Sequence, residues 1–378
     1  MKEPYVYDIE QLVNCHTNTF KNIYTGEIKQ FVIHNLRNDF DEYIDFLKND
    51  VKILVGFNNL EYDYPLIHYI LKNEKYLKTL NANLFNEKSY TESQRIINAK
   101  NNGEFITIRF QDELIHQVDL FKIWHYDNKA KLTGFKALEC HMGFHTVQEM
   151  PIHHTTPIYT FEEVNQVLEY NLNDVEATYE FYLITRGKTE NPLYKGKDKL
   201  QLRFDVRDKY KIECLNYNDI KLGTELILKL YCNKFDKNPY DIKKLRTYQN
   251  HINLKDCLPK WINFKSNEFK KLQNKFEKIS INNGETKGVV DFSVIYKGIK
   301  IDYGTGGAHA GNPGIYDYRN SNTHTIIDLD IDGMYPNLAI SQGLYPQHLG
   351  KEFIDIYDGE IVSKRTKEKK SLNLREIL

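Results

Sequence analysis

Two carboxylates, Asp8 and Glu10, stand two residues apart near the start of the chain. They close the run YVYDIE, whose alternation predicts a strand over residues 4–9. Residues two apart on a strand point to the same face, so we expect both carboxylates to project together. Buried like charges repel each other, and a hard divalent cation such as Mg²⁺, which prefers oxygen ligands, removes that repulsion. The pair therefore indicates a metal site that needs further carboxylates from elsewhere in the fold.

Two later stretches supply candidates for the same centre. GFNNLEYDYPLI carries Asn59 and Asp63 just past the predicted buried strand KILVGF. LEYNLNDVEATYEF carries Tyr170 and Asp174 on a predicted helix. Residues four apart share one face of a helix, so the Tyr170 hydroxyl and the Asp174 carboxylate can reach one site. A phenol beside a metal-binding carboxylate can orient a water molecule.

A second unusual region lies near the C-terminal end of the sequence. The glycines of IDYGTGGAHAGNPG, residues 301–314, would let backbone N–H groups approach a ligand closely, but no GK[ST] follows as in a P-loop. In IIDLDIDGMYPNLA, Asp328, Asp330 and Asp332 alternate along a predicted strand and would share one face.

The elements that must position these residues alternate between strands and helices over residues 1–184, which predicts an α/β domain. Within it we expect Asp39 to cap a helix over 39–49, and FITIRF and LIHQVDL to form a hairpin. Residues 199–278 are expected to be mostly helical, and strand patterns return after residue 289.

Bulk composition limits the class of protein. A chain of 378 residues suggests two or three domains, and 41 % hydrophobic with 27 % charged residues is typical of globular chains. The sequence has no apolar run long enough for a membrane span and no secretion signal at its N-terminus, and its five cysteines form no CxxC pair. These features predict a reducing, cytoplasmic location and no membrane partner.

Charge is unevenly distributed along the chain. Residues 189–300 contain 24 Lys and Arg against 14 Asp and Glu, whereas the remainder contains 27 against 38. A basic middle between acidic ends fits a protein that grips phosphates centrally and holds cations at its ends. Lys-rich helices that are merely solvated are the alternative.

The three stretches DIE, NLEYD and YNLND resemble, in their order and spacing, the exonuclease motifs of family B DNA polymerases of the bacteriophage type. The resemblance implies an RNase H-like mixed sheet and 3′→5′ removal of mispaired nucleotides with two Mg²⁺ or Mn²⁺ ions. It also implies residue roles: Asp8, Glu10, Asp63 and Asp174 hold the metals, Tyr170 orients the water, Asn59 contacts a single-stranded 3′ end, and Lys136 contacts a phosphate. Gln11 stands where many relatives have threonine.

The second region resembles two further parts of the same family. YGTGG is similar to the YxGG region between exonuclease and polymerase domains, which implies DNA contacts by Tyr303, Gly306 and Gly307. DIDGMYPN is similar to polymerase motif A, with Gly333 in place of its serine. By position, Asp330 would be a catalytic metal ligand, the carbonyl of Ile331 a second ligand, and Tyr335 would lie under the incoming sugar.

The resemblance implies three domains: an exonuclease over residues 1–188, a helical Lys-rich segment over 189–300, and the YxGG-type loop with a partial α+β palm over 301–378. The later KxxxNSxYG and YxDTD motifs of the family do not occur. We therefore expect the N-terminal portion of a replicative DNA polymerase, in a phage-infected bacterial cell, with an incomplete polymerase site. Its expected partners are single-stranded 3′ ends, primer-template DNA, a C-terminal polymerase half and, once the palm is completed, a dNTP. A stand-alone 3′→5′ exonuclease and a non-catalytic DNA-binding half of a split polymerase are the alternatives.

Overall fold

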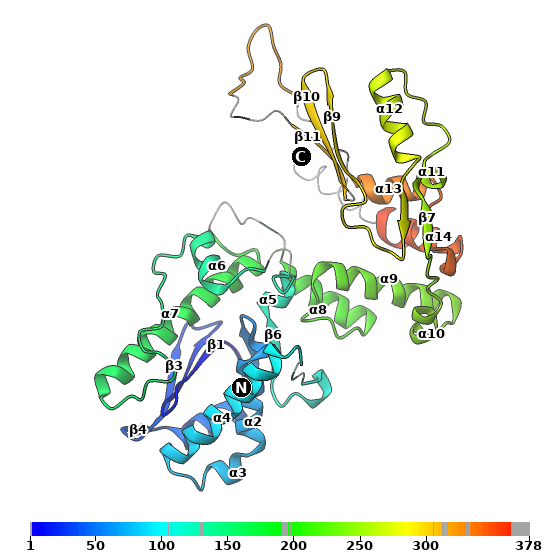
Figure 1. Cartoon of the computed structure of the whole chain (residues 1–378). Coiled ribbons are helices and arrows are strands. Elements are labelled where there is room, and N and C mark those ends of the chain that lie inside the picture. The colour runs from blue at the N-terminus through cyan, green and yellow to red at the C-terminus, as the bar shows by residue number, and fades with distance from the viewer. Residues whose placement is uncertain are drawn as a thin grey trace, which may run out of the picture. The chain divides into compact units, whose positions relative to one another are not determined.

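The chain consists of two compact units, Met1–Lys229 and Leu230–Leu378 (Figure 1). The computed structural model describes residues 2–104, 106, 108–128, 132–190, 196, 198–304, 306–311, 314, 317–327, 329, 331 and 333–363. The domain limits at residues 188 and 300 stay predictions.

A six-stranded mixed sheet is the centre of the first unit. Its strands are β1 (Glu3–Gln11), β2 (His16–Asn22), β3 (Ile28–His34), β4 (Arg37–Asn38), β5 (Val51–Gly56) and β6 (His116–Asp119), in the order β4-β3-β2-β1-β5-β6. The strands from β1 to β4 pair antiparallel with one another, whereas β5 runs parallel to both β1 and β6. The predicted α/β class is confirmed at this level.

Helices cover both faces of the sheet (Figure 1). They are α1 (Phe40–Asn49), α2 (Asp63–Lys72), α3 (Glu74–Leu77), α4 (Ala82–Asn101), α5 (Leu120–Ile123), α6 (Phe135–Met142), α7 (Phe161–Thr185) and α8 (Lys199–Tyr210). Helix α9 (Asp219–Phe235) contains the boundary between the two units. The longest of these helices in the first unit, α7, starts with a capping box between Thr160 and Glu163, which satisfies backbone N–H groups that have no partner inside the helix.

Successive side chains of β1 point to opposite faces of the sheet, into two different apolar cores. This alternation also determines the direction in which the carboxylates of β1 point. Tyr5, Tyr7 and Ile9 are buried with side chains of α1, α2 and α4, whereas Val6 is buried with side chains of α7. Asp8 and Glu10 are in phase with Val6, so both project toward α7. The predicted strand over residues 4–9 is confirmed, and it delivers both carboxylates to one face.

Strand β2 was not expected, because its sequence HTNTFKN has no apolar alternation. It nevertheless lies inside the sheet, between β1 and β3, with four polar side chains fully buried. Hydrogen bonds compensate for part of that burial: His16 bonds Gln11 at 3.0 Å, and Asn18 donates to the Tyr43 hydroxyl at 2.8 Å. Backbone pairing on both sides, rather than hydrophobicity, holds this strand in place.

Two predictions about local structure were wrong. The expected hairpin does not form, since β6 pairs parallel with β5 and the described residues of 105–110 belong to no strand. Phe110–Asp112 is instead a turn of 3₁₀ helix. Asp39 does precede α1, but its side chain caps nothing there and accepts hydrogen bonds from the Val32 backbone and Arg37. Strand β6 buries Gln117, Val118 and Asp119 beside β5, whereas a two-stranded ribbon would leave these side chains exposed.

The second unit contains two small antiparallel sheets and short helices. The strands β9 (Asp291–Tyr296), β10 (Ile299–Gly304) and β11 (Gly307–Gly311) form one sheet, and β7 (His251–Asn253) pairs with β8 (Ser280–Asn282). The helices are α10 (Pro239–Lys244), α11 (Leu254–Cys257), α12 (Asn267–Phe276), α13 (Met334–Ser341) and α14 (Glu352–Ile356). Most residues from 199 to 278 thus belong to the helices α8 to α12, as expected, with the short strand β7 among them.

Candidate metal centre

Three carboxylates from two elements converge on one point of the first unit. Asp8 and Glu10 come from β1 and Asp174 comes from α7, and one oxygen of each lies within 4.8 Å of the others. They meet because β1 turns its even-numbered residues toward α7, whose buried residues recur at helical spacing. Three carboxylate oxygens at this spacing suit a hard cation such as Mg²⁺.

Asp63 lies beside this triad rather than within it. It is the first residue of α2 and is 7 % exposed. Together with Asp8 and Glu10 it lines a cleft of about 420 Å³. The predicted four-carboxylate set is therefore gathered in one region, with Asp174, Asp8 and Glu10 closest together.

The loop that carries Asp63 is shaped by Asp119, a buried residue at the end of β6. Asp119 accepts hydrogen bonds from the backbone N–H of Asn58 at 3.0 Å and of Leu60 at 3.2 Å. Asn58 adopts the left-handed conformation, with φ of 61°. Gly56 is needed before this turn, because a Cβ there would lie 2.7 Å from the Cβ of Asn59. These contacts fold the chain back so that α2 starts at the acidic cleft.

Burial and mutual repulsion favour the neutral forms of the clustered carboxyls. Desolvation, and then repulsion by Asp174 and Asp63, raises the pKa of Glu10 to about 8. Desolvation raises the pKa of Asp63 to about 7, with Asp119 adding to the rise. The pKa of Asp8 lies well above its ordinary value, because of burial and then the charge of Glu10. Such a cluster needs a cation to stay ionised near neutral pH, and its donor set fits a divalent ion.

Lys136 is the cation that directly bonds Asp174 of this cluster. Its ammonium, on α6, lies 2.5 Å from Oδ1 of Asp174 and 3.1 Å from Oε1 of Glu139. It also lies 4.8 Å from the centre of the Tyr170 ring. Burial opposes the charge of Lys136, but the hydrogen bonds and negative charges of Asp174 and Glu139 together raise the pKa of the lysine.

Tyr170 and Asn171 complete the α7 side of the centre. The Tyr170 hydroxyl hydrogen-bonds the Asp174 carboxylate, and burial together with the charges of Asp174 and Glu10 raises its pKa, so it stays a phenol. Asn171 donates its amide to Oδ2 of Asp8 at 2.7 Å. Sequence reasoning identified Tyr170 but missed Asn171, whose only signal was its place beside Tyr170 on a helix.

Asn59 and Gln11 face the interior. Asn59 is 1 % exposed and donates to Oε1 of Gln117 at 2.8 Å, whereas its neighbour Asn58 lines the acidic cleft. Gln11 is also buried, and its amide bonds Asn86 and the Leu12 carbonyl. The predicted single-strand contact by Asn59 is untested, and its amide is already used inside the domain.

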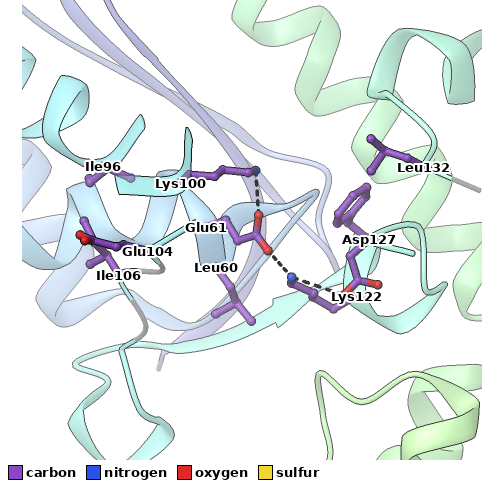
Figure 2. A pocket seen from close by; sticks show the side chains of 10 residues that line it. Leu60, Glu61, Ile96, Lys100, Glu104, Ile106, Lys122, Asp127 and Leu132 are labelled. Atoms are coloured by element: carbon purple, nitrogen blue, oxygen red, sulfur yellow. Dashed lines mark hydrogen bonds and ion pairs between the residues drawn. The ribbon is translucent and has the colours of Figure 1, made fainter. Parts of the chain in front are cut away.

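A second cavity, of about 550 Å³, lies around Glu61 (Figure 2). Glu61 stands in it between two ammonium groups, with Lys100 at 2.7 Å and Lys122 in closer contact (Figure 2). Although burial opposes it, bonding to these lysines lowers the pKa of Glu61. The apolar part of the wall consists of Leu60, Ile96, Ile106, Phe121 and Leu132. Glu61, Ile96 and Lys100 line both cavities, so the two lie side by side.

The second predicted constellation is not assembled by the described residues. Asp330, Asp328 and Asp332 lie outside them, and the described residues from Asp317 to Ile331 belong to no strand.

The remaining residues of that constellation lie on separate elements. Ile331 is 67 % exposed, and Tyr335, on α13, is 72 % exposed. Tyr303 is the next-to-last residue of β10 and stacks its ring on Phe292. Gly306 and Gly307 lie at the turn into β11.

No protein-family model, no curated protein and no solved structure matches this chain. Among the described residues, no helix is both long enough and apolar enough to cross a membrane.

Proposed function

We propose that the first unit is a divalent-cation-dependent 3′→5′ exonuclease that acts on single-stranded DNA ends and has an RNase H-like fold. The observation that carries this proposal is the convergence of Asp8, Glu10 and Asp174, with Asp63 on the same cleft. The mixed sheet supports it, because β1 carries the first carboxylates and has antiparallel and parallel neighbours.

In this proposal Asp8, Glu10, Asp63 and Asp174 hold two Mg²⁺ or Mn²⁺ ions. When bound, such ions polarise a phosphodiester and stabilise charge on the attacking and leaving oxygens. The protonated Tyr170 hydroxyl, fixed by Asp174, orients the attacking water. Asn171 orients Asp8, and the ammonium of Lys136 adds positive charge beside the phosphate.

The cavity around Glu61 suits the nucleotide next to the one being removed. Its apolar wall can cover the faces of a base, and a backbone phosphate there would compete with Glu61 for Lys100 and Lys122. Because this cavity adjoins the acidic cleft, a strand whose terminal phosphate lies at the carboxylates would reach it within one nucleotide.

The test follows release of nucleoside monophosphate from 3′-labelled single-stranded DNA in Mg²⁺. Asp174→Asn should abolish release, because it removes a metal ligand. Glu169→Gln, an exposed position on the same helix, is the matched control and should retain the rate of the unaltered chain. Equal rates for the two variants would exclude the proposed site.

We also propose that residues 301–378, within the second unit, belong to the palm of a family B DNA polymerase that a further polypeptide completes. What favours this is the exposure of the motif A-like segment: Ile327, Leu329, Ile331 and Tyr335 are each at least 67 % exposed. Apolar surface of this kind is typical of an interface. The isolated chain should then show no primer extension with Mg²⁺ and dNTPs, and measurable extension would contradict this.

A further inference from the structure

Glu139, on α6, is a buried carboxylate that the proposed reaction does not use. Its side chain is fully buried, and Lys136 is the partner of Oε1 at 3.1 Å. The other oxygen, Oε2, is buried and has no hydrogen-bond partner. An isolated buried carboxylate is costly, so a half-satisfied one next to a candidate metal centre calls for a functional explanation.

The ammonium of Lys136 is shared between this carboxylate and the metal centre. It lies 0.6 Å closer to Oδ1 of Asp174, at 2.5 Å, than to Oε1 of Glu139, at 3.1 Å. Asp174 is also one of the three carboxylates that meet within 4.8 Å. A cation that binds the triad therefore competes with Lys136 for Asp174, and a displaced ammonium needs another acceptor nearby.

We propose that Lys136 is a built-in counter-ion of the carboxylates in the metal-free protein and that Glu139 is the positioning residue that retains its ammonium when a divalent cation takes Asp174. Glu139 thereby lowers the cost of displacing Lys136 and raises the affinity of the centre for the cation. Three features fit this role: Glu139 lies one helical turn after Lys136, its free oxygen can accept a second bond, and it is not among the three clustered carboxylates. The inference rests on the proposed function, because the cation is the one that the nuclease needs.

The test measures Mn²⁺ affinity of the full chain without DNA, from the free Mn²⁺ signal in electron paramagnetic resonance. Glu139→Gln leaves Lys136 with Asp174 alone, so Mn²⁺ should bind about three- to tenfold more weakly. Lys136→Met removes the competitor, so Mn²⁺ should bind more tightly. In the double variant the loss caused by Glu139→Gln should vanish, because Glu139 acts only through Lys136.

Controls separate this role from a general effect of charge or of folding. Glu149 is an exposed carboxylate that repels Glu139 electrostatically. Glu149→Gln removes this charge and should leave Mn²⁺ affinity unchanged. If Glu139→Gln fails to fold by circular dichroism, Glu139→Met, which buries an apolar side chain of similar length, should fold and show the same loss.

The outcomes are distinguishable. Unchanged affinity in Glu139→Gln, or an equal loss in the Lys136→Met background, would overturn the inference. Absence of Mn²⁺ binding by the unaltered chain would contradict the metal centre and the inference together. If the Glu139 and Lys136 variants change Mn²⁺ affinity as expected but the unaltered chain cleaves no DNA, the inference stands and only the proposed nuclease activity is contradicted.

Discussion

Asn171 and Asp8, which are 163 positions apart in the sequence, are joined by a 2.7 Å hydrogen bond between the amide Nδ2 and the carboxylate Oδ2. The bond ties α7 to β1 at the point where the carboxylates meet. It favours the charged form of Asp8, against burial and the repulsion of Glu10. A neutral residue therefore fixes the orientation of one carboxylate of the candidate metal centre.

Replacing Asn171 should weaken the centre without unfolding it. In Asn171→Ala, Asp8 loses this neutral hydrogen-bond donor and Mg²⁺-dependent cleavage should slow by about tenfold or more. Single-turnover rates across a range of Mg²⁺ concentrations would measure this. Unaltered rates at every concentration would show that Asn171 does not orient Asp8.

Without divalent cations the protein should lose stability as the pH rises from 6 to 8.5. The raised pKa values of Glu10, about 8, and Asp63, about 7, mean that the folded state binds more protons than the unfolded state in this range. Stability then falls as these groups ionise. Mg²⁺ should consequently raise the melting temperature more at pH 8.5 than at pH 6. Thermal unfolding with and without Mg²⁺ at both pH values tests this, and a larger gain at pH 6 would contradict it.

Gly56→Ala should disturb the loop that carries Asp63. The new Cβ would meet the Cβ of Asn59 at 2.7 Å, a backbone-proximal atom that cannot move away freely. We expect a loss of about 1–3 kcal/mol of stability and slower cleavage. Gly134→Ala, where no atom lies within 4 Å of the new Cβ, is the matched control. Similar melting temperatures for the two variants would refute the steric argument.

Tyr170→Phe should slow cleavage while single-stranded DNA binding is retained. The substitution removes the hydroxyl that hydrogen-bonds Asp174 and keeps the ring beneath Lys136. Its effect should therefore appear in the rate of the bound complex rather than in the DNA dissociation constant. A matching loss of DNA affinity would instead indicate that Tyr170 binds the substrate.

The basic segment should contribute to DNA affinity through counterion release. Lys270 and Lys271 are exposed on α12, within residues 189–300. Replacing both by Gln should reduce the slope of log Kd against log salt by about 0.9 for each phosphate that the protein no longer neutralises. Lys72→Gln with Lys75→Gln, exposed lysines of the first unit, serves as the charge-matched control. Equal slopes in the two double variants would leave the segment as a solvated surface.

The grouping of the carboxylates was more predictable from sequence than the fold around it. Asp8 and Glu10 share a face because strands have a period of two, and Tyr170 and Asp174 share one because helices repeat near four, so local patterns carried this information. Strand β2 could not be found in this way, since His16 and Asn18 are buried by pairing with β1 and β3 and by distant partners such as Tyr43. Such contacts join residues far apart in sequence.

Residues that act through others were the hardest to predict. Asn171, Asp119 and Glu139 carry no motif, and their roles depend on which backbone or side-chain groups the fold brings to them. Glu139 had a faint local signal, three residues after Lys136 on a helix. The parallel pairing of β6 was missed for a related reason. Whether β6 pairs with β5 or with a hairpin partner depends on the rest of the sheet, and not on the sequence of β6 alone.

The central claim is that these carboxylates hold divalent cations against the last phosphodiester of a DNA strand. The most direct measurement uses single-stranded DNA whose terminal phosphodiester has sulfur in place of the leaving 3′ oxygen. Sulfur binds Mg²⁺ poorly and Mn²⁺ better, so cleavage should be strongly slowed in Mg²⁺, restored in Mn²⁺, and absent in Asp174→Asn under both conditions. Equal rates for the sulfur and oxygen substrates in Mg²⁺, or undiminished cleavage by Asp174→Asn, would contradict the account.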